Sequence, residues 1–175
     1  IRPHLGRYRE VSRSDEPHIA LFISDVHLGS GTFQEREWDK FISWLNGDVD
    51  YHKDWLPNPG YLIIAGDAVD GIDSYPGQEA DLSITDVWEQ YAELSKSVNR
   101  IPNEIQTVIM PGNHDAVRLM EPQLPLPDKV TKNFGDNLTF TANPVLLDLA
   151  GVKIMCYHGK SLDDLVSLRD LSYDN

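Results

Sequence analysis

The side chains in this sequence that could bind metal ions follow four short apolar runs. Asp25 and His27 come after residues 18–24, Asp67 after 61–65, Asn113 and His114 after 105–110, and His158 after 152–157. Carboxylate, imidazole and amide groups without a thiolate suit Mn²⁺, Fe or Zn²⁺ better than Ca²⁺, which prefers all-oxygen sites. An aspartate can bridge two such ions about 3.5–4 Å apart, and the pair activates water while it neutralises phosphoryl oxygens. These residue types therefore indicate metal-assisted hydrolysis of phosphate esters, with no covalent nucleophile.

The four apolar runs predict buried strands, because they are short, rich in Ile, Val and Leu, and bounded by Gly, Asp or Pro. Residues 144–157 also have the pattern of a hairpin that turns near Ala150-Gly151. Two helices are expected between the strands, which predicts the α/β fold class. In such folds ligands bind outside the carboxyl ends of the strands, so the candidate ligands are expected at one edge of the sheet.

The boundaries of both helices have sequence signals. Thr32 and Glu35 have the spacing of a capping box, and apolar residues follow at helical intervals until Gly47. The second helix is expected to begin near Asp81 or Ser83 and to end before residue 102, a proline. Residues 48–60, 71–80 and 121–128 are rich in Pro, Gly and Asp and predict loops.

Composition fits one domain of an ordinary globular protein. The 175 residues carry 15 basic and 28 acidic side chains, for a formal net charge of −13, which does not favour autonomous binding to nucleic acid. The sequence has no signal peptide and no apolar run of membrane-spanning length. Its one cysteine, Cys156, lies in an apolar run and fits a reducing cytoplasm. Residues 1–17 have the composition of a linker that follows a preceding domain.

Each candidate residue also has an ordinary interpretation. Asp67 and Asp70 could be turn formers, and Asn113 could occupy a left-handed turn. Asp115 could cap a short helix, and His158 could be a hydrogen-bonded histidine at the edge of the core. The occurrence of the motifs in order, each at a strand end, favours a common metal site over these separate explanations.

The ordered motifs resemble those of calcineurin-like metallophosphoesterases. The resemblance is carried by Asp-x-His at 25–27, Gly-Asp at 66–67, Gly-Asn-His-Asp at 112–115 and the single His158, and it covers residues 18 to about 160. It implies a central β-sandwich flanked by helices, formed by residues 18–175. The family also has a closing Gly-His-x-His motif, which this sequence lacks. We therefore expect the metallophosphoesterase domain to be incomplete at its C-terminal end.

The resemblance implies a role for each metal ligand. Asp25 and His27 would bind the first metal ion, Asn113 and His158 would bind the second, and Asp67 would bridge both. The implied cofactor is a pair of divalent ions, Mn²⁺ in first place, with Fe or Zn²⁺ as alternatives.

Two further residues would be catalytic. His114 resembles the histidine of the family that does not bind metal and that stabilises the transition state or protonates the leaving oxygen. Asp70 matches the acid that pairs with this histidine and would fix its tautomer and orientation.

A finer resemblance is to the small subunit of archaeal family D DNA polymerase. It is carried by residues 25–30 (DVHLGS), Trp38 with 41–47 (FISWLNG), 69–72 (VDGI), 75–79 (YPGQE), 114–118 (HDAVR), 121–123 (EPQ) and 157–164 (YHGKSLDD). This branch implies a 3′→5′ proofreading exonuclease that acts on DNA 3′ ends. The implied protein partner is a large catalytic subunit, and no membrane partner is expected. Loops 71–80 and 121–128 could contact either DNA or this partner.

Two other functions remain open. One is a free-standing phosphodiesterase that acts on nucleotides or small phosphate esters. Such an enzyme needs no positively charged surface for DNA, which fits the negative net charge of this protein. A non-catalytic scaffold is the other alternative, since the small subunits of eukaryotic replicative polymerases resemble this fold but lack the ligands. The ligands that persist here argue against a scaffold.

Overall fold

The computed structural model describes residues 17–52 and 59–168. The linker expected over residues 1–17 therefore lies almost entirely outside the described residues. The described part contains a four-stranded parallel sheet in the order β1-β2-β3-β4. Its strands are β1 (Ile19–Ile23), β2 (Pro59–Ala65), β3 (Gln106–Met110) and β4 (Leu138–Phe140). The first three confirm the expected strands, whereas β4 was not expected.

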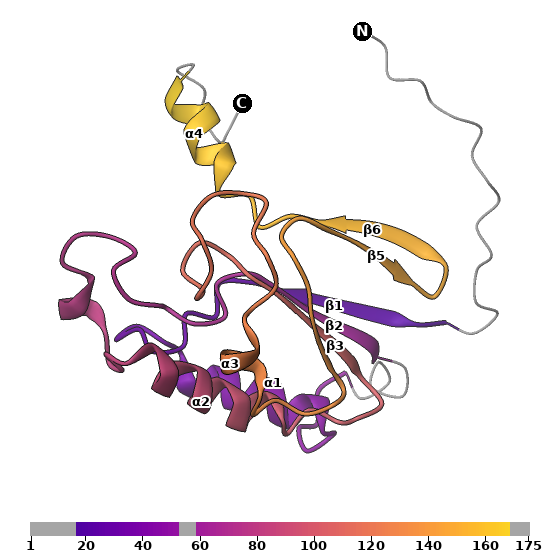
Figure 1. Cartoon of the computed structure of the whole chain (residues 1–175). Coiled ribbons are helices and arrows are strands. Elements are labelled where there is room, and N and C mark those ends of the chain that lie inside the picture. Colours follow the sequence, from indigo (N-terminus) through magenta and orange to yellow (C-terminus); the bar gives the residue numbers. More distant parts are fainter. Residues whose placement is uncertain (1–16, 53–58, 169–175) are drawn as a thin grey trace, which may run out of the picture.

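Helices α1 (Glu35–Leu45) and α2 (Val87–Val98) cover one face of this sheet (Figure 1). The apolar stripe of α1, with Ile42 fully buried, and that of α2, with Leu94 fully buried, share one core with Leu62 and Ile64 of β2. Alternate residues of a strand face opposite sides of a sheet, so Leu62 and Ile64 face the helices together.

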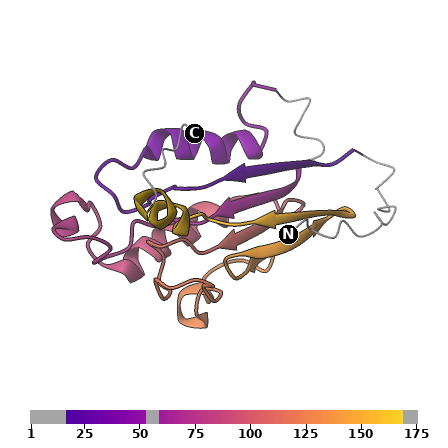
Figure 2. The ribbon, with the colours of Figure 1, turned by 90° about the horizontal axis from the view of Figure 1, so that it is seen from above.

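The other face is covered by a hairpin of β5 (Val145–Leu149) and β6 (Val152–Cys156), which lies over the sheet in two perpendicular views (Figures 1 and 2). Leu149 and Cys156 pack against Ile63 of β2 in a second buried cluster. The expected turn is confirmed, since Ala150 and Gly151 both have positive φ, at 48° and 85°. The α/β class is thus confirmed, and the described part of the second β layer consists of these two strands.

The expected capping box of α1 is wrong. The helix is preceded by Gln34, which makes no side-chain capping bond, and the Thr32 hydroxyl instead hydrogen-bonds the hydroxyl of Ser30 at 3.1 Å. The turn around Gly31 explains this, because the Gly31 N–H donates to the Asp81 carbonyl at 2.7 Å. That bond ties the turn to a distant loop, and Thr32 lies too early to cap the helix.

The expected start of α2 is also wrong. The cap is Asp86, whose carboxylate accepts from the backbone N–H groups of Trp88 at 2.7 Å and Glu89 at 3.1 Å. Asp81 instead ends a short 3₁₀ helix, η1 (Gln78–Asp81), and the Ser83 hydroxyl donates to the Gly29 carbonyl at 3.0 Å. Tertiary contacts to the loop after β1 therefore delay the helix by several residues.

Two short helices complete the described part, α3 (Asp128–Thr131) and α4 (Ser161–Leu168). Neither was expected from the sequence. In Figure 1, α4 lies beyond the carboxyl ends of the strands, away from the helical layer. Among the helices in the described ranges, none combines the length and the hydropathy that a membrane span requires.

Candidate metal centre

In the loops that follow β1 and β2, two aspartates and one histidine have an uncommon backbone conformation. Asp25, His27 and Asp67 have φ values of 54°, 50° and 51°, in the left-handed region that few residues other than glycine adopt. Backbone hydrogen bonds join the two loops. The Asp25 N–H donates to the backbone carbonyl of Gly66 at 3.1 Å, and the His27 N–H donates to the backbone carbonyl of Asp67 at 3.0 Å. Such conformations often occur at functional sites, where the surrounding structure enforces them.

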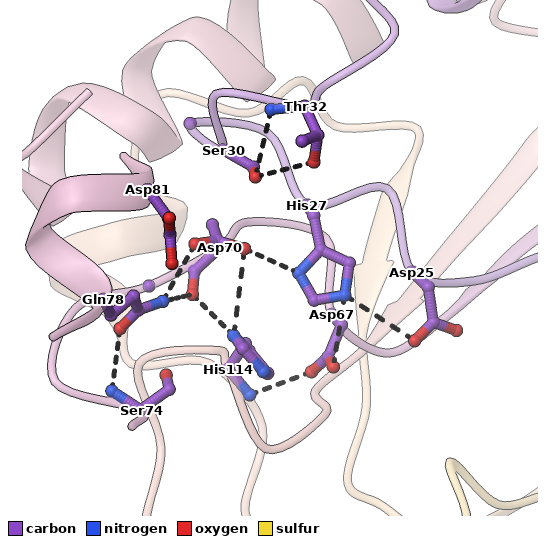
Figure 3. Close-up of polar contacts among 12 residues, drawn as sticks. Asp25, His27, Ser30, Thr32, Asp67, Asp70, Ser74, Gln78, Asp81 and His114 are labelled. Carbon is purple, nitrogen blue, oxygen red and sulfur yellow. Dashed lines mark hydrogen bonds and ion pairs between the residues drawn. The ribbon is translucent and has the colours of Figure 1, made fainter. Parts of the chain in front are cut away.

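Asp25, His27 and Asp67 form a first donor cluster, shown in Figure 3. His27 Nε2 lies 3.7 Å from Asp25 Oδ1 and 3.8 Å from Asp67 Oδ2, and the three ligand atoms all lie within 4.8 Å of one another. The Asp67 side chain is almost fully buried, at 4% exposed, whereas that of Asp25 is 56% exposed. The cluster therefore combines a buried carboxylate with one that solvent can reach.

Asp67, Asn113 and His158 form a second donor cluster. His158 Nε2 lies 3.2 Å from Asp67 Oδ2 and 3.2 Å from the amide oxygen of Asn113. Its Nδ1 donates to the Ala65 carbonyl at 3.0 Å, which orients Nε2 toward both oxygens. Asp67 Oδ2 thus faces both His27 and His158, and this one carboxylate belongs to both clusters.

Two glycines make room for this arrangement. A Cβ at Gly66 would lie 2.3 Å from His158 Nδ1, and a Cβ at Gly112 would lie 2.2 Å from Asp67 Oδ1 and 2.7 Å from His158 Nε2. All three distances are far below van der Waals contact, so only glycine allows the imidazole and the carboxylate to approach the strand ends. These glycines were recognised in the motifs, but their steric role was not predicted.

Asp67 and His158 form an ion pair, with His158 Nε2 3.2 Å from Asp67 Oδ2. Burial acts to raise the pKa of Asp67, but hydrogen bonds from His158 and from the backbone N–H of His114 outweigh it, so the pKa lies below its ordinary value. The hydrogen bond to Asp67 raises the pKa of His158 to about 9. A negative carboxylate that attracts a cation this strongly, beside a neutral amide oxygen, is chemically suited to a divalent metal ion.

Asp70 orients the imidazole of His27. Its Oδ1 accepts from His27 Nδ1 at 2.9 Å, which leaves Nε2 of His27 to face Asp25 and Asp67 (Figure 3). His27, Asp70 and His114 also lie close enough to form a third group of potential ligands. In that group, however, the contact between His27 and Asp70 is already a hydrogen bond from Nδ1.

The expected pairing of Asp70 with His114 takes a different form. His114 Nδ1 donates to the backbone carbonyl of Asp70 at 2.7 Å, whereas the carboxylate lies 4.0 Å away. The carboxylate is directed instead to His27 and to Gln78, whose amide donates to Asp70 Oδ2 at 2.8 Å. Asp70 therefore fixes the tautomers of two histidines, one through its side chain and one through its backbone.

The sequence analysis did not predict the supporting role of two buried side chains, Gln78 and Asp115. Gln78 is 1% exposed and also accepts the backbone N–H of Ser74 at 2.8 Å. Asp115 is buried, accepts from the Gly112 N–H at 2.8 Å and the Tyr91 hydroxyl at 2.9 Å, and burial raises its pKa to about 6. The expectation that Asp115 could cap a short helix is wrong, because residues 115–119 are not helical. A glutamine within a loop carries no sequence signal that marks it as a supporting residue.

A cleft of about 610 Å³ opens beside the first cluster. Asp25, His27, Asp70 and His114 line it, so two ligands of the first cluster and the candidate catalytic histidine are reached from the same opening.

The sequence matches the family of DNA polymerase alpha/epsilon B subunits over residues 20–169. The chain belongs to this family. The match includes every candidate ligand from Asp25 to His158, so the two clusters lie inside the part of the chain that defines membership of the family.

Similar proteins include the DNA polymerase II small subunits of three archaea. That of Methanocaldococcus jannaschii is 48% identical over 100% of this chain and 30% of its own length. That of Archaeoglobus fulgidus is 45% identical over 88% of this chain and 32% of its own length. That of Pyrococcus furiosus is 39% identical over 90% of this chain and 26% of its own length. The chain thus spans about a third of the length of these relatives.

Proposed function

We propose that this chain is the nuclease domain of an archaeal DNA polymerase small subunit, a two-metal phosphodiester hydrolase of the calcineurin-like type. The observation that carries the proposal is the position of Asp67, whose Oδ2 faces both His27 Nε2 and His158 Nε2. A carboxylate between two donor sets is what a pair of bridged ions requires. Exposed acidic clusters are common without a metal, but this carboxylate is buried and faces two histidines.

The residues of the chain would divide the chemistry between them. Bound divalent ions would supply charge neutralisation for the phosphate and an activated water. Asp25 and His27 would hold one ion, and Asn113 and His158 the other, with Asp67 between them. In its protonated form His114 has a second N–H, at Nε2, that can donate to the leaving oxygen while Nδ1 stays bonded to the Asp70 carbonyl.

The names of the relatives support the biological setting. Because similar proteins are small subunits of DNA polymerase II, we propose that this chain acts with a large catalytic subunit and removes nucleotides from DNA 3′ ends. A 3′→5′ exonuclease in a polymerase would serve proofreading. Mn²⁺ is the proposed ion, with Fe or Zn²⁺ as alternatives, because the donor set mixes carboxylate, imidazole and amide groups.

A free-standing phosphodiesterase is the second candidate function. It is favoured by the net charge of −13, since small phosphate esters need no basic surface. Hydrolysis of a chromogenic diester by a protein that leaves DNA ends intact would support this candidate over the first.

The proposal is tested with the full-length protein in Mn²⁺, assayed with and without the large subunit. The substrates are a 3′-labelled single strand and a primer–template with a mismatched end. We expect the parent protein to release terminal nucleotides, and His114→Ala to lower the rate by about 100-fold or more while metal content is unchanged. A protein that binds two ions per chain but degrades neither substrate would overturn the exonuclease, and one that binds no metal would leave only a scaffold.

A further inference from the structure

Aromatic rings line the cleft beside the candidate metal centre. Phe33 precedes α1, Phe41 lies within that helix, and Tyr75 lies in the loop after β2. The same cleft is lined by His27 and His114. Any substrate that reaches the metal ligands through this opening therefore passes flat apolar surfaces.

The charges in the cleft do not suit a grip on phosphates. Its acidic side chains are Asp25, Glu37 and Asp70, and the described residues that line it include no lysine or arginine. Proteins that bind nucleic acid through the backbone neutralise phosphates with lysine and arginine. Because this lining offers no cationic side chain to phosphates, its aromatic rings are the groups best suited to hold a nucleic acid, through the bases.

Hydrogen bonds and ring contacts hold both Tyr75 and Phe41 in place. The Tyr75 ring is 42% exposed, its hydroxyl donates to Asp81 at 2.9 Å, and its centroid lies 6.4 Å from that of His114. Phe41 lines the cleft while half-buried, and its ring centroid lies 5.8 Å from that of Trp38 and 6.1 Å from that of Trp44. Rigid aromatic rings lose little conformational entropy when a base stacks on them.

We propose that Phe41 and Tyr75 stack on unpaired bases at the 3′ end of a DNA strand and deliver its terminal phosphodiester to the metal centre. Stacking on aromatic rings tolerates any base, because every base has a π-face. A base inside a duplex has both faces covered, so the cleft selects single-stranded or frayed ends. This inference rests on the proposed function and adds to it a preference for unpaired DNA, with stacking as its source.

The test compares two substrates in the full-length protein with Mn²⁺. One is a labelled single strand, and the other is the same strand with abasic sites at its last two positions. Loss of stacking is expected to lower kcat/KM by about tenfold on the abasic strand. Phe41→Leu, which keeps an apolar side chain in the core, and Tyr75→Ala are expected to lower kcat/KM on the normal strand by about five- to tenfold.

The decisive readout is the combination of variant and substrate. On the abasic strand the variants should cleave as fast as the parent, because the contact they remove is already absent. A purely structural loss would reduce cleavage of both strands equally. Tyr75→Phe keeps the ring but loses the hydrogen bond to Asp81, so it should lose less activity on the normal strand than Tyr75→Ala. Trp88→Ala, which changes a 45% exposed aromatic residue on α2 outside the cleft, is the matched control and should leave both rates unchanged.

Equal cleavage of the two strands by the parent protein, or equal losses on both strands in the variants, would overturn the stacking proposal while the exonuclease stands. A parent protein that cleaves neither strand in Mn²⁺ would instead refute the proposed function, and the stacking proposal with it.

Discussion

At the scale of single residues, the centre depends on which nitrogen of each histidine faces the candidate ligands. Asp70 accepts from Nδ1 of His27, and the Ala65 carbonyl accepts from Nδ1 of His158. In both imidazoles the nitrogen that remains, Nε2, faces Asp67. Hydrogen bonds of this kind fix the tautomer and orientation of metal-binding histidines. Hydrogen bonds within the protein therefore orient the imidazoles of both donor clusters.

The ion pair between His158 and Asp67 predicts how metal binding depends on pH. In the metal-free protein the pKa of His158 is about 9, so below this pH an ion must displace a proton from Nε2. Lower pH favours the proton, and the apparent affinity for the ion at this cluster should rise by about tenfold per pH unit between pH 6 and pH 8. A competition titration with Mn²⁺ at several pH values measures this slope. An affinity that is flat over this range would show that His158 is not a ligand.

At the scale of elements, the site depends on glycine at the ends of β2 and β3. Replacing Gly66, whose φ is 100°, with alanine would place Cβ 2.3 Å from His158 Nδ1. We expect Gly66→Ala to displace the imidazole and to abolish binding of the second ion, as measured by metal content.

Gly77→Ala is the matched control for this substitution. Gly77 has a similar φ of 85°, but a Cβ there would meet nothing within 4 Å. It should cost only the backbone strain, about 1–2 kcal/mol, and leave metal content unchanged. Equal metal content in both variants would contradict the steric role assigned to Gly66.

The elements also show how far the sequence alone could be interpreted. Strands β1 to β3 and the hairpin were predicted because Ile-, Val- and Leu-rich runs bounded by turn residues are a local signal. Strand β4 has only three residues, and Thr139 is exposed, so no such signal marks it. The start of α2 was misplaced because Asp81, Ser83 and Asp86 are all good capping residues. Contacts to the loop after β1, far away in the sequence, decide among them.

The candidate site was predicted more fully than the residues that support it. The motifs named every side chain of the two clusters, since residues at the carboxyl ends of parallel strands meet at one edge. The orientation of Asp70 toward His27, and the contribution of Gln78, depend on side-chain rotamers and on a 3₁₀ turn. Neither follows from residue type and spacing.

At the scale of the whole molecule, the net charge of −13 favours the binding of metal ions but opposes the binding of DNA. The acidic clusters suit divalent cations, while DNA would be repelled by the same surface unless other groups attract it. The large catalytic subunit, the bound ions and base stacking in the cleft are the three sources of attraction that we propose.

The central claim is that Asp67 bridges two ions, and anomalous scattering from Mn²⁺-soaked crystals of the full-length protein tests it most directly. We expect two peaks about 3.5–4 Å apart. One should lie beside Asp25 and His27, the other beside Asn113 and His158, with the Asp67 carboxylate between them. A single ion among His27, Asp70 and His114, or no ordered ion at all, would contradict the claim.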